Sequence, residues 1–537
     1  MTVSFEPEPL PSFPAFPARL NLAEYFLDHN LDAGRAGKAA LWVGDEMRTY
    51  GRVAERSRRV AAALRRAGVR PEERVLLVLP DGFEFAEAFF GVLRAGAVFA
   101  MVNPLLKCEE YAYYLEYSKA RVVIAHASTL PELAPAFRRA RLAKSLFVVG
   151  PSTDFTPYED ALDAEDPDSD LAATEPTGPD DLAGWLFTSG STGRSKACVH
   201  RQRDFAYSTE TYARRVVGYR ESDVCLSVPK LFFGYATGTN LMFPFRFGGS
   251  VALFAQRATA EELFDQIAMH SPTVLTSVPT MVNNMLRSER MAGADLGSLR
   301  VTLSAGEALP RPLLEEWQAR AGVEILDGIG SAEMFHIYIT NHPGEVKPGS
   351  LGRVVEGYEA RIIDGSGRGV SDGEPGRLQV RGGSTAICYW ADRDKSIETF
   401  AGEWCTSADI FRRDAEGFYW YEGRSDDLLK CSGIWVSPIE IEEALLAHPA
   451  VAQVCVVGHD EGDGLVKPLA FVVPRVGHVG DDTLGEALKI HLKGLLAPHK
   501  YPRWFLWRAD LPKNDRGKVA RRELKAQLEA VRSEKVS

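Results

Sequence analysis

The 537-residue chain has few cysteines, no long apolar run and no secretory signal, and each of these shortages excludes some classes of protein. It has only seven cysteines, which stand far apart and form no Cys-x-x-Cys pair, so we expect no disulfide framework and no structural zinc site. It has no run of 18 apolar residues, so we expect no transmembrane helix and no membrane partner. The N-terminal residues lack the basic start and apolar core of a secretory signal, which predicts a cytoplasmic protein.

The chain also lacks an excess of positive charge. Its formal net charge is −11, and basic residues are scattered apart from the tail after Lys513. A nucleic-acid binder usually carries a basic patch, so we expect no nucleic-acid partner. Apolar residues make up 45% of the chain and charged residues 25%, which are globular values. The length alone suggests about three to four domains of ordinary size.

The first two thirds of the chain alternate between apolar strand-like runs and helix-like runs. Strands are expected at 74–79 and 97–102, with a helix at 83–94 between them. A second set of strands and helices is expected between 205 and 304. Such alternation predicts parallel sheets covered by helices, and therefore an α/β fold with two sheets. Residues 151–181 are rich in Pro, Asp, Thr and Ser and are expected to form a linker or a long surface loop.

The length and type of the expected secondary-structure elements change twice in the last third of the chain. From about residue 350, short strands separated by Gly and Asp turns predict a small antiparallel sheet or barrel. After Arg424, a helix at 438–448, a strand at 452–457 and a final helix near Ala520 predict a compact α+β domain. We therefore expect an N-terminal domain of residues 1–425 and a small, mobile C-terminal domain of residues 426–537.

The segment TSGSTGRSK at 188–196 follows an apolar run at 182–187. Its two glycines let the backbone approach a ligand, the hydroxyls of Thr188, Ser189, Ser191 and Thr192 can donate hydrogen bonds, and Lys196 adds a positive charge. These are the properties of a loop that binds phosphate. The spacing is not that of a P-loop, and an ordinary polar turn could have the same composition.

Two glycine-bearing segments end successive strands of the second sheet. They are SAGE at 304–307 and DGIGSAE at 327–333. Loops at the carboxyl ends of neighbouring strands form the ligand crevice of an α/β sheet. The carboxylate of Glu333 suits Mg²⁺, which prefers oxygen ligands, although a plain β-turn with a solvated glutamate would look the same.

Later segments supply further charged candidates. Asp409, in CTSADI, and Arg424, in YEGRSDD, could bind the two hydroxyls of a ribose, although a turn and a surface ion pair are the simpler interpretations. Lys518, in PKNDRGK, could interact with a carboxylate and a phosphate together, but it could equally belong to a surface loop. The aromatic segment at 232–235 and His336 could simply be core residues.

The six segments occur in an order that resembles the adenylate-forming superfamily, and the resemblance covers nearly the whole chain. KLFFGY at 230–235, DGIGS at 327–331, EMFH at 333–336 and GIWVSP at 433–438 resemble benzoate-type aryl-CoA ligases more closely. The resemblance implies that ATP and a carboxylate give an acyl-adenylate and pyrophosphate. The thiol of coenzyme A then displaces AMP.

The resemblance also implies a role for each matching position. The β- and γ-phosphates would be bound by Thr188, Ser189, Gly190, Ser191, Thr192, Gly193 and Lys196. Gly306, Glu307, Asp327 and Gly328 would flank the adenine, Asp409 and Arg424 would bind the ribose, and Glu333 would help to bind Mg²⁺. Lys518 would bridge the carboxylate and the α-phosphate, an electrostatic catalytic role.

The remaining implied positions concern the acid, coenzyme A and the hinge. Phe233, Gly234, Tyr235, Gly330 and His336 are expected to line the pocket for the aromatic acid. Gly433 would lie on the coenzyme A tunnel, and Asp426 would be the hinge about which the C-terminal domain turns.

Some residues depart from the usual pattern, namely Ser195, Cys198, Ala332 and Asn514, but none of these changes removes a charge. Gly234 stands where alanine is expected in benzoate ligases. The missing methyl group favours an ortho-substituted acid, with 2-aminobenzoate first. The expected effect is small, because a methylene-sized change in a pocket contributes only about 1–3 kcal/mol.

The leading hypothesis is therefore an ATP-dependent aryl-CoA ligase that acts on benzoate or 2-aminobenzoate. One alternative is an aryl-adenylating enzyme that loads a separate acyl carrier protein. Basic residues for the nucleotide phosphate of coenzyme A, with Lys467 and Arg503 as candidates, would distinguish the two. A second alternative is a catalytically inactive nucleotide-binding scaffold. A homodimer is expected from the resemblance alone.

Overall fold

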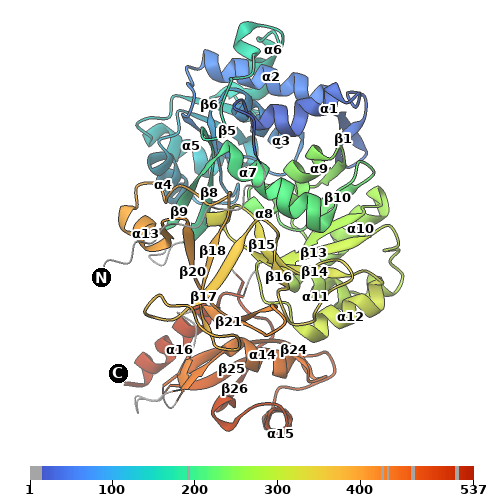
Figure 1. Ribbon diagram of the computed structural model, residues 1–537, viewed down its shortest axis with the longest axis vertical. Helices are drawn as coiled ribbons and strands as arrows, with labels where there is room; N and C mark the ends of the chain where they lie inside the picture. Colours follow the sequence, from blue (N-terminus) through green and yellow to red (C-terminus); the bar gives the residue numbers. More distant parts are fainter. Residues whose placement is uncertain are drawn as a thin grey trace.

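The computed structural model describes residues 15–189, 194–424, 429–431, 434–460, 466–513 and 519–536. Figure 1 shows two large α/β sheets with helices around them, a small antiparallel sheet beside them, and the C-terminal elements gathered below β21 at the bottom of the view. This arrangement confirms the predicted fold class.

The first sheet has seven strands in the order β7-β6-β5-β3-β4-β8-β9, and all neighbours are parallel except the hairpin of β8 and β9. The strands are β3 (Arg74–Val78), β4 (Val98–Met101), β5 (Val122–His126), β6 (Ser145–Val149), β7 (Thr156–Pro157), β8 (Leu182–Ser189) and β9 (Ser195–Arg201). The helices that follow or precede them are α2 (Tyr50–Arg66), α3 (Phe83–Arg94), α4 (Cys108–Ser118) and α5 (Leu130–Arg139). The central strands β3 and β4 are apolar and buried, as expected for parallel strands covered on both faces.

The expectation of a linker or surface loop at 151–181 is wrong in part. This region contains β7, which pairs with β6, helix α6 (Tyr158–Asp163) and a short 3₁₀ helix, η3 (Asp170–Ala172). Tyr158 and Leu162 are buried, and Glu159 accepts a hydrogen bond of 2.7 Å from Arg56 of α2. Two apolar anchors are enough to fix a segment whose average composition is that of a loop.

The second sheet has nine strands in the order β16-β15-β14-β13-β12-β10-β11-β1-β2. They are β1 (Ala39–Val43), β2 (Glu46–Thr49), β10 (Val224–Ser227), β11 (Ser250–Leu253), β12 (Val274–Ser277), β13 (Val301–Ala305), β14 (Ile325–Gly330), β15 (Ile337–Thr340) and β16 (Arg353–Val354). The strands from β1 through β11, β10, β12 and β13 to β14 are parallel, and antiparallel pairs close both edges.

The helical segments around the second sheet include several short pieces. They are η1 (Glu24–Asp28), α1 (His29–Asp32), α7 (Gln202–Ser208), η4 (Thr209–Val217), α8 (Gly234–Thr237), η5 (Gly238–Met242), α9 (Phe243–Arg246), α10 (Ala260–His270), α11 (Pro279–Arg287), α12 (Arg311–Ala321) and η7 (Ala332–Met334). Of these, α8 and η7 matter most below because they carry predicted site residues.

The small sheet is antiparallel throughout, as predicted. It contains β17 (Glu359–Ile363), β18 (Gly376–Arg381), β19 (Phe400–Ala401), β20 (Trp404–Arg413) and β21 (Tyr419–Arg424), with α13 (Arg393–Thr399) before β19.

The C-terminal elements have hydrophobic clusters of their own, so they can pack as a unit. They are β22 (Leu429–Cys431), β23 (Ile434–Val436), α14 (Pro438–Leu446), β24 (Val451–His459), β25 (Lys467–Pro474), α15 (Asp482–Lys493), β26 (Trp504–Trp507) and α16 (Arg521–Val536). Ser437 Oγ donates a hydrogen bond of 2.5 Å to the carbonyl oxygen of Glu422, which joins them to β21. The predicted boundary between 425 and 426 lies outside the described residues and stays a prediction.

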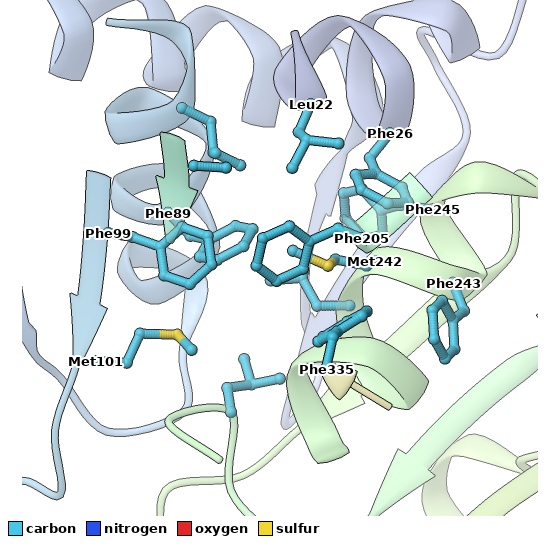
Figure 2. Packing of buried hydrophobic residues seen from close by; sticks show 14 of the residues in the cluster. Leu22, Phe26, Phe89, Phe99, Met101, Phe205, Met242, Phe243, Phe245 and Phe335 are labelled. Carbon is cyan, nitrogen blue, oxygen red and sulfur yellow. The ribbon is translucent and has the colours of Figure 1, made fainter. Parts of the chain in front are cut away.

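One aromatic core joins the two large sheets, as Figure 2 shows. The ring of Phe205, on α7, lies 5.5 Å from that of Phe99, on β4, and 4.5 Å from that of Phe335, which follows η7. Phe335 has a positive φ of 64°, which is strained for a bulky residue. Such strain costs about 1–3 kcal/mol, and aromatic contacts of about 0.5–1.5 kcal/mol each offset it. The core therefore fixes the η7 turn next to β8 and β9.

Candidate active site

The two predicted strand-end loops of the second sheet lie side by side. Ser304 of β13 pairs with Asp327 of β14, and Ala305 pairs with Gly328. The segments SAGE and DGIGSAE therefore leave the sheet at the same edge, as expected for a ligand crevice. Gly306 has a φ of +91°, a backbone conformation that favours glycine.

The predicted phosphate segment spans the tip of the β8–β9 hairpin. Thr188 and Lys196 are paired across the hairpin, so both lie next to its tip. Within the part of the chain that the structure describes, no carboxylate forms an ion pair with Lys196, whose ammonium instead lies 4.0 Å from the centre of the Tyr389 ring. An uncompensated lysine is suited to an anionic ligand. Residues 190–193, which include the predicted Gly190, Ser191, Thr192 and Gly193, lie outside the described residues.

Glu333, on the short helix η7, is held by contacts from two other elements. The Tyr389 hydroxyl donates a hydrogen bond of 2.5 Å to Glu333 Oε1, and Ala386 N donates to the Glu333 carbonyl oxygen at 2.8 Å. One residue earlier, His200 Nε2 lies 2.7 Å from the Ala332 carbonyl oxygen. The carboxylate is thus fixed between β9 and the 386–389 segment before any ligand binds.

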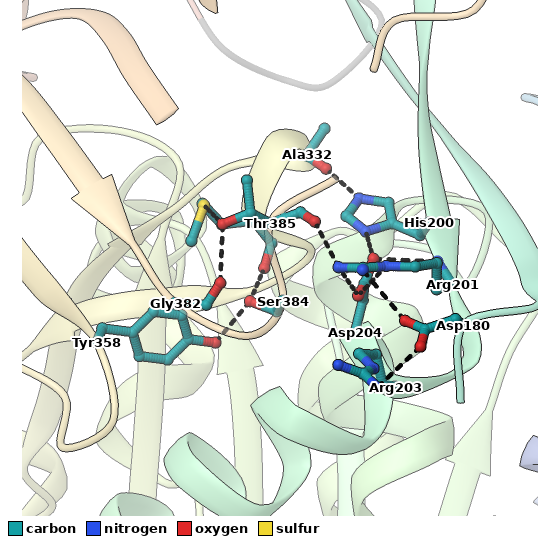
Figure 3. A network of polar contacts seen from close by, with 11 residues as sticks. Asp180, His200, Arg201, Arg203, Asp204, Ala332, Tyr358, Gly382, Ser384 and Thr385 are labelled. Carbon is teal, nitrogen blue, oxygen red and sulfur yellow. Dashed lines mark hydrogen bonds and ion pairs between the residues drawn. The ribbon is translucent and has the colours of Figure 1, made fainter. Parts of the chain in front are cut away.

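A buried polar network supports this contact, as Figure 3 shows. His200 and Asp204 are both fully buried, and His200 Nδ1 lies 3.1 Å from Asp204 Oδ2. Arg201 donates to Asp204 Oδ1 through Nε at 3.2 Å and reaches the Thr385 carbonyl oxygen at 3.4 Å. The network ties β9, α7, the η7 turn and the 385–389 segment into one support.

The residues present fit a magnesium ion that is brought in with a phosphate ligand. Among the described residues, no group of three or more His, Cys, Asp or Glu could hold a metal alone. Mg²⁺ commonly takes one or two protein carboxylates and fills its remaining positions with phosphate oxygens and water. The carboxylate of Glu333 has further lone pairs besides the one that accepts from Tyr389, so it can supply such a ligand.

The two candidate ribose residues are neighbours in the small sheet. Asp409 of β20 pairs with Arg424 of β21. The Ser407 hydroxyl donates a hydrogen bond of 2.8 Å to Asp409 Oδ2. Burial raises the pKa of Tyr338, and the nearby carboxylates of Asp409 and Glu333 add to this rise. Asp409 and Glu333 thus lie near the same buried side chain although 75 residues separate them in the sequence.

Two of the candidate adenine residues have structural partners of their own. Glu307 Oε2 accepts hydrogen bonds from the backbone and hydroxyl of Thr280, at 3.0 and 2.8 Å, and so caps the start of α11. Asp327 is almost fully buried, and this burial raises the pKa of its carboxyl to about 8. The neighbouring Ser304 hydroxyl opposes the rise. The side chain of Asp327 is therefore protonated near neutral pH, and Gly328 provides the backbone beside it.

The acid end of the candidate site is aromatic and neutral. His336 Nε2 donates a hydrogen bond of 3.1 Å to the carbonyl oxygen of Tyr235, on α8. The His336 ring also lies 4.6 Å from the Phe243 ring and 5.3 Å from the Tyr212 ring. Complete burial lowers the pKa of His336 to about 3, so its imidazole is uncharged at neutral pH. The structure therefore brings Tyr235 and His336 together, as the sequence predicted.

The other three acid-pocket candidates are Phe233, Gly234 and Gly330. Phe233 precedes α8 and its ring lies 4.2 Å from that of Phe232. A methyl group on Gly234 would lie 3.2 Å from a terminal carbon of Leu186, so an alanine needs only a small shift of that side chain. A side chain on Gly330 would lie 2.6 Å from the backbone of His336, so glycine is required at this close crossing.

Three of the predicted functional residues cannot be placed. Lys518, Asp426 and Gly433 lie outside the described residues, so their roles remain predictions. Lys513 and Val519, the described residues on either side of 514–518, form a β-bridge just before α16.

Sequence reasoning missed the residues that hold the site in place. Tyr389 and His200 lie in no segment that we singled out, and only the fold brings them to Glu333. Asp81 was missed as well. Its carboxylate accepts a hydrogen bond of 2.8 Å from the backbone of Leu231, and Lys230 lies next to it. The turn at 80–82 follows a predicted strand, and this signal could have identified Asp81.

Comparison with known families agrees with this geometry. The model of the family described as AMP-binding enzyme matches residues 28–390, and that of the AMP-binding enzyme C-terminal domain matches residues 440–518.

The chain belongs to the AMP-binding enzyme family.

Similar proteins within this family include ligases of aromatic acids. A benzoate–CoA ligase of Thauera aromatica is 42% identical over 513 residues, which cover 95% of this chain and 96% of the relative. An anthranilate CoA ligase solved with anthranoyl-AMP superposes with a TM-score of 0.92 at 36% identity, over 96% of this chain and 99% of that chain. A benzoate CoA ligase from Burkholderia xenovorans LB400 gives a TM-score of 0.87 at 43% identity, over 94% and 99% of the two chains.

Across the described ranges, no helix is both long and apolar enough to cross a membrane. None of the seven cysteines, all of which lie in these ranges, forms a disulfide bond, and five of them are buried.

Proposed function

We propose that this AMP-binding enzyme is an ATP-dependent aryl-CoA ligase that forms an acyl-adenylate from an aromatic carboxylate and transfers the acyl group to coenzyme A. One observation carries the proposal. Lys196, on β9, and Glu333, on η7, both contact Tyr389, and η7 leads directly into His336 and the neutral aromatic cluster. Such a site can hold the phosphates of a nucleotide at one end and an aromatic ring at the other.

In the first half-reaction, a carboxylate oxygen of the acid attacks the α-phosphorus of ATP, and the bond to the β-phosphate breaks to release pyrophosphate. Lys196 and the backbone of the β8–β9 tip bind the β- and γ-phosphates. Asp409 and Arg424 bind the ribose, while the edge formed by Gly306, Glu307, Asp327 and Gly328 receives the adenine. Mg²⁺, when bound to Glu333, neutralises phosphate charge. Lys518 stabilises the negative charge that develops between the acid and the α-phosphate.

In the second half-reaction, the thiolate of coenzyme A attacks the acyl carbon, and the mixed anhydride bond breaks to release AMP. The C-terminal domain turns about Asp426 between the two steps, which is a gating motion, and Gly433 leaves room for the pantetheine arm. The backbone N–H of Arg503 donates a hydrogen bond of 2.9 Å to the Pro468 carbonyl oxygen, and β25 pairs with β26. The backbones of Lys467 and Arg503, near the starts of these two strands, therefore lie close to one another. Two neighbouring cations suit the nucleotide phosphate of coenzyme A. A carrier protein would not require them, so they favour coenzyme A as the acceptor.

The acid is an aromatic carboxylate, with 2-aminobenzoate and benzoate as the first substrates to test. The uncharged His336 and the aromatic rings around it favour a neutral ring over a charged one, because an unpaired charge in such a pocket would be desolvated. Gly234 lacks the methyl group that would lie 3.2 Å from Leu186, and the absence of this group favours a substituent beside the carboxylate.

The test is one assay with the purified protein, MgATP, coenzyme A and a panel of benzoates, cinnamates and fatty acids, with products identified by mass spectrometry. A thioester from benzoate or 2-aminobenzoate is the expected result. Accumulation of adenylate without thioester would favour the carrier-protein alternative, and thioesters from fatty acids alone would contradict the aromatic pocket. Light scattering on the same sample tests the proposed homodimer, and fractionation of the source cells tests the proposed cytoplasmic location.

A further inference from the structure

Tyr389 stands between the two charged groups that face the nucleotide phosphates. Its ring lies under the Lys196 ammonium, which is 4.0 Å from the ring centre, and its hydroxyl donates to Glu333 Oε1 at 2.5 Å. One side chain thus contacts the cation through its π face and the anion through its polar end. Tyr389 itself is 5% exposed.

The backbone around Tyr389 is fixed to the strand that carries Lys196. Val199 N donates to the Cys388 carbonyl oxygen at 3.0 Å, and Trp390 N donates to the Ala197 carbonyl oxygen at 2.9 Å. The segment therefore runs alongside β9, and Tyr389 forms an isolated antiparallel β-bridge with Cys198. The tyrosine moves with β9, so its distance to Lys196 is set by the backbone.

This arrangement solves a problem that the two charges create. A lysine and a glutamate with nothing between them would form an ion pair, and each would then be partly neutralised before ATP arrives. A cation–π contact is weaker, at about 0.5–2 kcal/mol, so a phosphate can replace it readily. The hydrogen bond to Oε1 leaves the other carboxylate oxygen of Glu333 available and fixes its direction.

We propose that Tyr389 is a positioning residue that keeps Lys196 and Glu333 apart and directs them to the ATP phosphates and to Mg²⁺, respectively. The inference rests on the proposed function, because it assumes that ATP and Mg²⁺ bind here. It assigns separate tasks to the two parts of one side chain. The hydroxyl acts on metal-dependent binding through Glu333, and the ring acts on phosphate binding through Lys196.

The test is to measure ATP binding by titration calorimetry without acid or coenzyme A, once with excess Mg²⁺ and once with EDTA. In Tyr389→Phe, which keeps the ring, we expect about a 10-fold loss of the Mg²⁺-promoted affinity, the usual effect of removing an outer partner of a metal ligand. Affinity in EDTA should stay at the wild-type value. Tyr389→Leu, which lacks ring and hydroxyl, should bind ATP more weakly under both conditions.

Tyr50→Phe is the matched control, because the buried Tyr50 hydroxyl donates a comparable hydrogen bond of 2.5 Å to Gly249 O outside the site. It should change neither titration. Glu333→Gln combined with Tyr389→Phe should show the same Mg²⁺ dependence as Glu333→Gln alone, since the hydroxyl acts through that carboxylate.

Three results would overturn the inference. One is a Tyr389→Phe protein that matches the wild type under both conditions, and another is one that loses affinity equally with Mg²⁺ and with EDTA. The third is an additive loss in the double variant. Wild-type protein that binds no ATP at all would overturn the proposed function as well, so the two failures are distinguishable.

Discussion

The two ends of the candidate site are built on different physical principles. At the phosphate end, separate elements hold charged side chains by directed hydrogen bonds, as Tyr389 and Ala386 do for Glu333. At the acid end, packed rings and a neutral imidazole shape the pocket, and the hydrogen bond from His336 to Tyr235 joins two parts of the wall. The first end depends on charge and the second on volume. Changes at the two ends should therefore alter different kinetic constants.

The largest expected effect is that of Lys518→Ala. If Lys518 stabilises the charge that develops at the α-phosphate, its removal should slow adenylate formation by about 100- to 1,000-fold, as the loss of one such group does in other enzymes. Pyrophosphate release measures this step. Conversion of synthetic acyl-adenylate and coenzyme A to thioester should persist, because Lys518 acts only in the first half-reaction. Lys525→Ala, an exposed change on α16, is the control, and equal rates in both variants would contradict the assigned role.

Lys196→Met sharpens the comparison at the phosphate end. A hydrogen bond to a charged group contributes about 1.5–3 kcal/mol, so the kcat/KM for ATP should fall by about 10- to 100-fold. The KM for the aromatic acid should not change, because we propose that the acid binds among the neutral rings beyond Glu333. Steady-state kinetics with each substrate varied in turn separate the two constants. Lys144→Met replaces an exposed lysine outside the site and should leave both constants as they are.

Gly234→Ala is the corresponding change at the acid end. The added methyl group would lie 3.2 Å from Leu186 and would need a small shift there, so it should lower the ratio of 2-aminobenzoate to benzoate turnover. The change in a pocket of this kind is about 1–3 kcal/mol at most, and the KM for ATP should stay constant. Competition between the two acids in one reaction measures the ratio directly. Gly365→Ala is the control because a methyl group there meets no atom within 4 Å. An unchanged ratio would remove the argument for an ortho substituent.

The sequence predicted the parts of the site that lie in short, local segments. The loops after β13 and β14 were predicted to meet at one sheet edge, and Ser304 and Asp327 are indeed paired. The resemblance assigned Tyr235 and His336 to one pocket; the two residues are in contact, and the pocket itself stays a prediction. The strand ends could be predicted because strand periodicity fixes where each loop begins.

The supporting contacts could not be predicted, because they join residues that are remote in the sequence. Tyr389 lies 56 positions after Glu333, and His200 lies 132 positions before Ala332. No local pattern indicates that the segment around Tyr389 will form a β-bridge with β9. The region at 151–181 shows the opposite error, since its loop-like composition hid the buried anchors of α6. Average composition does not reveal which few side chains are buried.

The smallest effect on turnover is expected from Asp327→Asn. The stability of this variant tests whether the sheet edge that we propose for the adenine is uncharged near neutral pH. Burial raises the pKa of Asp327 to about 8, from an ordinary value of 3.8. The folded state therefore binds one more proton than the unfolded state between these two values, and stability falls as the pH rises through this range. An amide cannot ionise, so the variant should lose less stability between pH 5 and pH 9 than the wild type does. Thermal unfolding at the two pH values measures the difference. A parallel loss in both proteins would show that Asp327 is already ionised near neutral pH. The neutral part of the site would then be limited to the surroundings of His336.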